Sequence, residues 1–141
     1  MASSRNETQI TWSSASSVTV SSATAVTSDA FTYNVEDWDA ELQVNADNAG
    51  TPASGDTCAV YIAYTTGDIL GDSGSDYATT EHAEYLGLLD TVAANTPGED
   101  PANKTFFIRT APLGFKVIVV CAQAASRNIV VRARVVTHRP Q

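Results

Sequence analysis

Arginines near the end of the chain are the residues whose type and spacing point most directly to a binding function. Arg132 and Arg134 lie two positions apart in a segment that alternates apolar and polar residues, and Arg139 follows. Residues two apart on a β-strand share one face, so Arg132 and Arg134 would project from the same side of a sheet. Arginine suits planar, bidentate ion pairs with carboxylates across interfaces. The pattern predicts either such an interface or an ordinary solvated face.

Three aspartates recur at every fourth position in a Gly/Ser-rich segment, where their oxygens could ligate a cation. They are Asp68, Asp72 and Asp76. Calcium binds several oxygens on a flexible loop, but this spacing departs from the EF-hand pattern. The alternative, which we favour, is a solvated loop in which the aspartates stabilise turns.

Other residues with catalytic potential lack a partner at a useful spacing. His82 and His138 have no second histidine, cysteine or paired carboxylate at metal-ligand spacing, so we expect solvated side chains. Four acidic residues surround Trp38: Glu36, Asp37, Asp39 and Glu41. An exposed turn is a simpler interpretation of them than the acid pair of a glycosidase. The sequence has no nucleophile elbow, phosphate loop or dinucleotide fingerprint. We therefore expect no enzyme activity, no metal and no cofactor.

Period-two alternation of apolar and polar residues predicts the strands that must position these side chains. The clearest case sets Ala40, Leu42, Val44 and Ala46 against polar neighbours. Further strands are expected at residues 10–12, 18–20, 31–35, 57–65, 105–110, 115–122 and 129–138. Polar turn segments at 47–56, 66–78 and 93–103 separate them. Many short strands at this spacing predict one all-β domain over residues 1–141, an antiparallel, jelly-roll-like β-sandwich.

Two parts of this prediction leave alternatives open. Residues 79–92 fit either a helix or a strand, and we favour a short helical turn at 80–84 followed by a strand at 85–91. Cys58 and Cys121 lie in apolar strand patterns and could face each other across the sandwich. The start of the chain lacks the pattern of a secretory signal, so we expect both thiols to be buried and mostly free, in a protein made in a cytoplasm.

Charge divides the chain into an acidic body and a basic end. The formal net charge is −8; all 16 acidic residues lie between Glu7 and Asp100, and seven of the eight basic residues lie between Lys104 and Arg139. An acidic protein gains no counterion release on nucleic acid, so nucleic-acid binding is not expected, and no apolar run is long enough to cross a membrane. The basic residues either pair across strands within one sheet or meet acidic groups between subunits.

The two ends of the chain have the least to contribute to a sandwich core. We expect an extended N-terminal arm at residues 1–11 and a C-terminal tail at 136–141. As a hypothesis, these ends contact a neighbouring subunit or another protein. The candidate interface residues are Met1, Arg5, Glu7, Arg132, Arg134, His138 and Arg139.

Three segments give the chain a resemblance to a known family. They are GTPASGDTCAVYIAYTTGDIL (50–70), EYLGLLDTV (84–92) and TAPLGFKVIVVCAQAASRNIVVRARVV (110–136), with a Ser/Thr/Ala/Val-rich opening, TWSSASSVTVSSATAVTSDAFTY. In style and order these segments resemble the small decoration, or cement, proteins on the outer capsid of tailed bacteriophages. The resemblance marks no site residues and does not explain the two cysteines.

That resemblance implies a structural virion protein with a jelly-roll or similar sandwich. It would form a homo-oligomer, a dimer or trimer, made in the host cytoplasm, and would bind the major capsid protein on the outer surface of the shell. The alternative is a carbohydrate-binding or adhesin-type sandwich. That function would need exposed aromatic residues on one concave face, drawn from Trp12, Trp38, Tyr61, Tyr77 and Tyr85.

Overall fold

The named secondary-structure elements among the described residues are all β-strands. The structure, a computed structural model, describes residues 3–48, 53, 55–91, 102–123 and 128–140. Within these residues no helix is long and apolar enough to cross a membrane. The strands there are β1 (Ser3–Gln9), β2 (Val18–Val20), β3 (Ala25–Thr27), β4 (Phe31–Thr32), β5 (Asp39–Asn48), β6 (Thr57–Thr65), β7 (Glu84–Asp90), β8 (Ala102–Ile108), β9 (Gly114–Ala122) and β10 (Ile129–Pro140).

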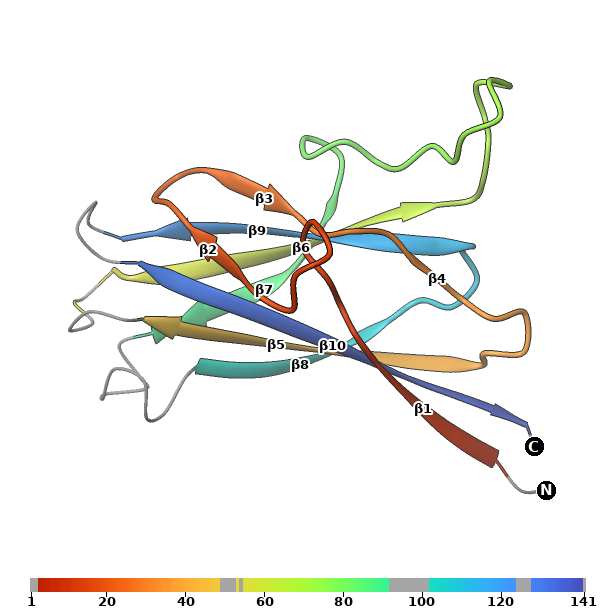
Figure 1. Ribbon diagram of the computed structural model, residues 1–141, viewed down its shortest axis with the longest axis horizontal. Helices are drawn as coiled ribbons and strands as arrows, with labels where there is room; N and C mark the ends of the chain where they lie inside the picture. The colour runs from red at the N-terminus through yellow and green to blue at the C-terminus, as the bar shows by residue number, and fades with distance from the viewer. Residues whose placement is uncertain (1–2, 49–52, 54, 92–101, 124–127, 141) are drawn as a thin grey trace.

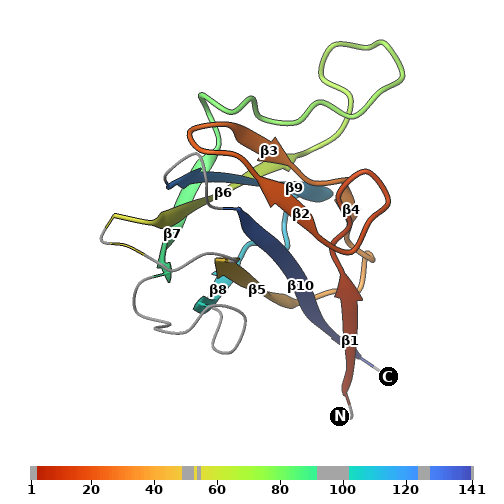
Figure 2. The ribbon, with the colours of Figure 1, turned by 60° about the vertical axis from the view of Figure 1, so that its left-hand side comes forward.

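The strands form two antiparallel sheets that pack face to face. One sheet, here the β10 sheet, has the order β1-β10-β5-β8, with β2 also paired to β10. The other, the β9 sheet, has the order β3-β9-β6-β7, with β4 also paired to β9. The two layers are seen in Figures 1 and 2, where the chain passes repeatedly from one to the other as in a jelly roll. The predicted antiparallel sandwich is confirmed.

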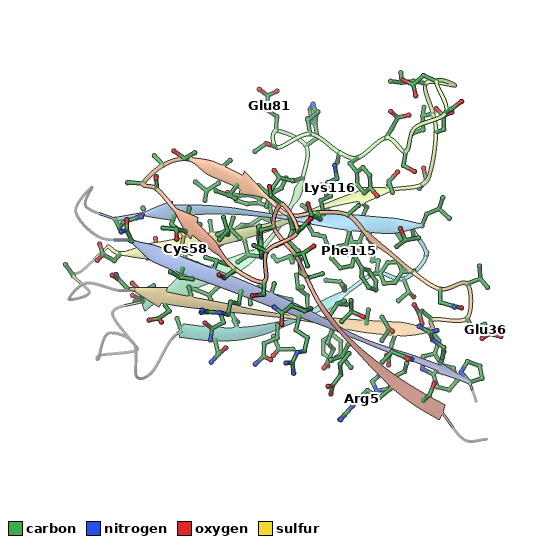
Figure 3. The ribbon with its side chains drawn as sticks, in the orientation of Figure 1. Arg5, Glu36, Cys58, Glu81, Phe115 and Lys116 are labelled. Carbon is green, nitrogen blue, oxygen red and sulfur yellow. A yellow bond between two sulfur atoms is a disulfide. The ribbon has the colours of Figure 1, made fainter. Side chains whose placement is uncertain are left out.

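Alternation along the strands fills the space between the sheets. Residues 40, 42, 44 and 46 of β5 are buried, as are residues 129, 131, 133 and 135 of β10, while most of the residues between them are partly or fully exposed. Phe115 of β9 is fully buried and contacts the rings of Phe31 and Tyr33, with centroids 5.2 and 5.6 Å away. Figure 3 shows Phe115 between the two layers. Burial of this one face fixes the register of each long strand.

The N-terminal segment is extended, as predicted, but the chain's own last strand holds it. β1 pairs with β10 over seven residues, from Ser3 opposite Pro140 to Gln9 opposite Arg134. Figure 1 places the two termini side by side at one end of the molecule. The predicted C-terminal tail is likewise the end of β10, paired with both β1 and β5. An outside partner is therefore not needed to order either end.

Local differences from the predicted strands have simple causes. Residues 80–82 form a turn, in which the His82 amide donates to the Thr79 carbonyl, and β7 follows as the favoured strand. β4 ends at Thr32 rather than at residue 35, because the Asn34 and Asp37 side chains accept backbone N–H bonds and turn the chain. Short polar side chains compete with strand pairing in this way.

Cys58 and Cys121 form a disulfide, so the expectation of free thiols is wrong. Both residues are fully buried, as predicted. They do not face each other across the sandwich: Cys58 on β6 lies directly opposite Cys121 on the neighbouring strand β9. The sequence shows that both side chains point inward, but only the register between two strands 63 residues apart shows that they meet. Figure 3 marks Cys58 in the interior.

Prediction: removing the disulfide destabilises the protein without changing its fold. The bridge spans a sequence separation of 63 residues, and closing a loop of that size restricts the unfolded chain by roughly 4 kcal/mol in the chain-entropy account. Urea unfolding of the oxidised and reduced protein should show a lower midpoint after reduction. The Cys58→Ala/Cys121→Ala variant is the control, because reductant should not change its midpoint. Equal midpoints for oxidised and reduced wild type would contradict the bridge.

Candidate functional site: the outer face of the β10 sheet

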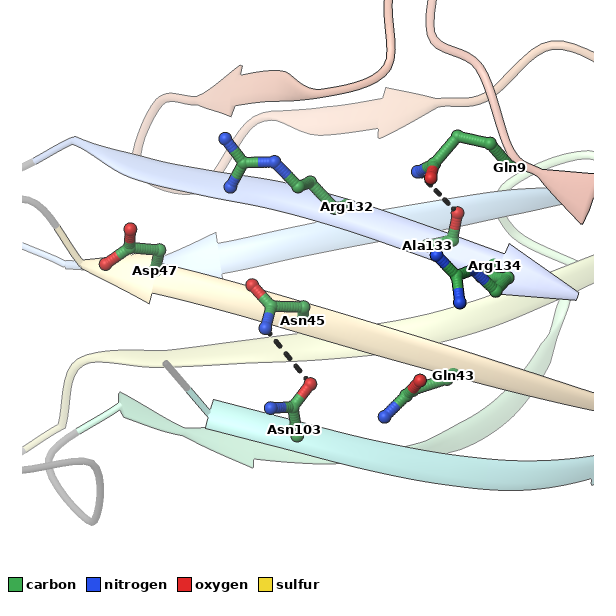
Figure 4. Close-up of a pocket in the computed structure, with 8 residues that line it drawn as sticks. All are labelled: Gln9, Gln43, Asn45, Asp47, Asn103, Arg132, Ala133 and Arg134. Carbon is green, nitrogen blue, oxygen red and sulfur yellow. Dashed lines mark hydrogen bonds between the residues drawn. The ribbon is translucent and has the colours of Figure 1, made fainter. Parts of the chain in front are cut away.

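A shallow polar groove crosses the outer face of the β10 sheet. Its volume is about 350 Å³, and β1, β5, β8 and β10 all contribute to it (Figure 4). The lining side chains are mostly amides and guanidinium groups: Gln9, Gln43, Asn45, Asp47, Asn103, Arg132, Ala133 and Arg134. Such a surface offers many planar hydrogen-bonding groups and few apolar ones.

Arg132 and Arg134 stand on this face without a partner carboxylate. Strand alternation points both side chains outward, as predicted, and both are exposed. The residues opposite them on β5 are the amides Asn45 and Gln43. Within the ranges that the structure describes, neither arginine makes an ion pair or a side-chain hydrogen bond. Two adjacent guanidinium groups are thus available to an external acceptor.

The floor beneath the arginines is held by amide hydrogen bonds. The Asn45 amide on β5 donates to Asn103 Oδ1 on β8 at 3.0 Å. The Gln9 amide donates to the Ala133 carbonyl at 3.0 Å and so ties the end of β1 to β10. Figure 4 shows both bonds. Because Asn45 bonds to Asn103 and Gln9 bonds to the backbone of β10, these side chains fix the surface from which the arginines project.

The remaining candidate interface residues have partners inside the chain. Arg5 pairs with Glu7 along β1 at 3.1 Å, and both side chains are exposed. His138 Nδ1 lies 2.6 Å from Asp39 Oδ1 on β5, its cross-strand neighbour. Met1 lies outside the described residues. In Figure 3 Arg5 points away from the sandwich.

Arg139 differs from the other candidates because its partner is buried. Arg139 Nε lies 3.0 Å from Asp37 Oδ1, and the Asp37 side chain has no exposed surface. Pairing within the chain, one of the two interpretations of the charge pattern, therefore accounts for part of the basic residues. Arg5, His138 and Arg139 belong to pairs within the β10 sheet or at its edge, whereas Arg132 and Arg134 have none in the described chain.

Asp68 and Asp76 stabilise turns, which is the interpretation the sequence favoured. The Asp68 carboxylate accepts the backbone N–H groups of residues 71, 72 and 73. These bonds, that from Ser73 above all, hold the pKa of Asp68 below its ordinary value. Asp76 accepts the N–H groups of Ile69 and Leu70. Among the described residues, no three His, Cys, Asp or Glu side chains gather as metal ligands would.

The aromatic residues that a carbohydrate-binding face requires do not share one surface. Trp12 is buried in the core, and Trp38 is exposed next to the start of β5. The rings of Tyr61 and Tyr85 lie 5.4 Å apart and are tilted by 58° on the β9 sheet, which is the opposite layer from the groove. Tyr77 lies in the loop between β6 and β7, under the Lys116 ammonium. This arrangement does not favour the carbohydrate-binding alternative.

Sequence reasoning found the two arginines but not the amides around them. Gln43 and Asn45 were expected only as the wet face of a strand, and nothing drew attention to Gln9 or Asn103. A local signal exists, because Gln43 and Asn45 alternate with buried residues on β5. Gln43 and Asn45 lie beside β8, β1 and the arginines because of the order of the strands in the sheet. The alternation of residues along one strand does not determine that order.

Prediction: the basic residues of β10 divide into structural and non-structural ones. Arg139→Ala leaves the buried Asp37 carboxylate without its counter-ion, which should lower the free energy of unfolding by roughly 3 kcal/mol. Arg132→Ala and Arg134→Ala remove no internal ion pair or hydrogen bond, so each should change the free energy of unfolding by less than about 0.5 kcal/mol. Urea unfolding measures all three. A large loss of stability in either of the last two variants would show an internal role for that arginine.

No family model and no curated protein matches the chain. Among solved structures, it is similar to a CBM36-1 domain of a multidomain xylanase from the hindgut metagenome of Trinervitermes trinervoides, at 9% identity over 93% of this chain and 96% of that one, with a TM-score of 0.49. It is also similar to a chain in the acid-stable capsid structure of Helicobacter pylori bacteriophage KHP30, at 17% identity over 98% and 95% of the two chains, with a TM-score of 0.44. A third is the VP2 subviral particle of infectious bursal disease virus, at 8% identity over 97% of this chain and 37% of that one, with a TM-score of 0.47. At these identities and TM-scores the similarities assign no function.

Proposed function

We propose that the chain is a structural virion protein that binds the outer surface of a bacteriophage capsid and stabilises the shell. The observation that carries the proposal is the pair Arg132 and Arg134, two exposed guanidinium groups with no partner in the described part of an acidic protein. The resemblance of three long segments to capsid decoration proteins supplies the identity of the partner, the major capsid protein.

The outer face of the β10 sheet has the properties of an attachment surface. Residues two apart on one strand lie roughly 7 Å apart, which is also the spacing of alternate carboxylates on an extended partner strand. Arginine loses less solvation than lysine on burial and can bind each carboxylate through two hydrogen bonds. The amide floor presents further donors and acceptors without adding charge.

A rigid scaffold makes such a surface effective. β10 lies between β1 and β5, so the arginines project from a strand that is hydrogen-bonded on both sides. A surface that is already ordered loses little conformational entropy on binding. A homo-oligomer on the shell, either a dimer or a trimer, belongs to the same proposal.

Prediction: replacing the two arginines weakens attachment and leaves the fold intact. Shells of the phage that encodes the chain, assembled without it, are mixed with wild type or with Arg132→Ala/Arg134→Ala, and binding is read by co-sedimentation. Each charged hydrogen-bonded contact is worth about 1.5–3 kcal/mol, so affinity should fall by a factor of about 100 or more. Wild-type binding should also weaken with salt more steeply than binding of the variant.

The matched control is Lys104→Ala. Lys104 is an exposed cation on β8, but its ammonium lies over the Phe106 ring rather than in the groove. Its removal changes the net charge by the same amount as one arginine and should leave attachment unchanged. Truncation of the N-terminal residues is a poorer test, because it also removes the pairing of β1 with β10. Tight, salt-independent binding by the double arginine variant would overturn the assignment of this face.

A further inference from the structure

The N-terminal strand is an open edge of the β10 sheet. β1 is the first strand in the order β1-β10-β5-β8, and among the described residues it pairs with β10 alone (Figure 1). Its side chains are polar, and those of Arg5, Glu7, Thr8 and Gln9 are exposed. The free side of an edge strand presents backbone N–H and C=O groups that can pair with a further strand.

The pairing of β1 with β10 determines which backbone groups point to the free side. The Ile10 N–H donates to the Ala133 carbonyl at 2.9 Å, directly after the seven residue pairs of the two strands. Hydrogen-bonded residues alternate along an antiparallel ladder, so the even-numbered residues of β1 turn their N–H and C=O groups toward β10. The N–H and C=O groups of Arg5 and Glu7 therefore point away from β10.

Only one two-fold register of β1 with a second copy sets opposite charges face to face. Residues that hydrogen-bond across the contact must both point to the free side, so the two-fold axis has to pass beside a residue. An axis beside Arg5 or Glu7 would set two like charges opposite each other. An axis beside Ser4 or Thr8 would pair fewer residues and no opposite charges. An axis beside Asn6 pairs all seven residues of β1 and sets Arg5 of each copy opposite Glu7 of the other.

Arg5 and Glu7 are placed to make this contact. They lie on the outer face of the β10 sheet, the face to which Gln9 of the groove belongs, because residues two apart on a strand share a face. They form a pair along the strand at 3.1 Å, with 67% and 45% of their side-chain surfaces exposed. Exposed pairs contribute little to folding, so both side chains remain able to bond across a contact. The two charges also leave β1 neutral within an acidic protein.

The other long edge strands carry features that oppose pairing with a second copy. Full-length antiparallel pairing of two β7 strands would set Glu84 of one opposite Asp90 of the other. On β8, Lys104 lies on the side that faces the other sheet, opposite the buried Val44. An inward-pointing charge on an edge strand blocks strand addition. The corresponding inner-face residues of β1 are uncharged, so β1 is the long edge best suited to self-association.

We propose that two copies of the chain associate through β1, in antiparallel pairing about a two-fold axis beside Asn6. Backbone N–H and C=O groups of Arg5 and Glu7 in one copy bond to those of Glu7 and Arg5 in the other. The side chains of the same residues form ion pairs across the contact, because directly opposite residues share a face. The two β10 sheets then become one continuous sheet.

This contact leaves Arg132 and Arg134 uncovered. The two-fold axis between antiparallel edge strands runs perpendicular to the sheet, so the outer faces of both copies point the same way. The arginine pairs of both copies would then face one side, where two attachments to a single surface reinforce each other. The strand contact itself does not rest on the capsid proposal, because it uses other residues and another partner.

The test is sedimentation equilibrium of the full chain over a series of concentrations. Wild type should show a reversible equilibrium between the monomer and a dimer. Arg5→Glu sets two glutamates opposite each other at both ends of the contact, and Glu7→Arg sets two arginines there. Each single reversal should therefore weaken dimerisation by about tenfold or more.

Two further samples make the test specific for the register. The double reversal Arg5→Glu/Glu7→Arg restores opposite charges and should dimerise like wild type. An equimolar mixture of the two single variants should form a heterodimer, because glutamates at positions 5 and 7 of one chain meet arginines at positions 7 and 5 of the other. Heterodimer formation would also show that both single variants are folded.

The matched control is Glu81→Arg. It changes the net charge by the same amount as Glu7→Arg, but Glu81 is an exposed residue of the turn before β7, and Figure 3 draws it beyond the β9 sheet, on the other layer from Arg5. This variant should dimerise like wild type.

Three results would overturn the proposal. The first is a wild-type chain that stays monomeric at millimolar concentration. The second is a double reversal that dimerises no better than the single variants. The third is a set of reversals that leave self-association unchanged but weaken co-sedimentation with shells, because the occupant of this edge would then be the capsid protein.

Discussion

The structure depends on the burial of one face of β10. Ile129, Val131, Ala133 and Val135 are inserted between the sheets, and this strand is paired with β1, β2 and β5 at once. A one-residue slip would expose the apolar set and bury arginines, so the register is strongly fixed. The same constraint that builds the core therefore also determines that Arg132 and Arg134 face outward and how far apart they stand.

Ion pairing explains why only some of the basic residues are available for binding. Arg139 neutralises a buried carboxylate, and Arg109 donates to Glu84 at 2.8 Å. That bond, the largest influence on its charge, raises the pKa of Arg109 above its ordinary value. Arg132 and Arg134 have amides as cross-strand neighbours instead. A carboxylate at position 43 or 45 would have paired with them across the strands and removed the surface from use.

Local alternation made most of the strands predictable, because side-chain direction on a strand has a period of two. β5, β6, β9 and β10 follow their predicted segments closely. β1 could not be predicted, since its sequence, SSRNETQ, has no apolar face and its strand conformation comes from pairing with β10. The disulfide was not predicted for the same reason. The alternation around Cys58 and Cys121 indicates that each is buried, but their pairing depends on which strands are neighbours. The groove could not be predicted either, because its residues come from four strands whose order the sequence does not reveal.

The positions of the charged side chains constrain any oligomer of this chain. In a two-fold symmetric dimer, each contact patch meets a copy of itself. A dimer through the groove would set the arginine pair against its own copy, and one through the loop between β6 and β7 would set Asp68, Asp72 and Asp76 against theirs, so both are opposed by like charge. A cyclic trimer uses heterologous contacts, in which two different patches meet. Such contacts would need the arginine pair that the capsid proposal assigns to the shell, so subunits of a homo-oligomer would meet through other parts of the molecule.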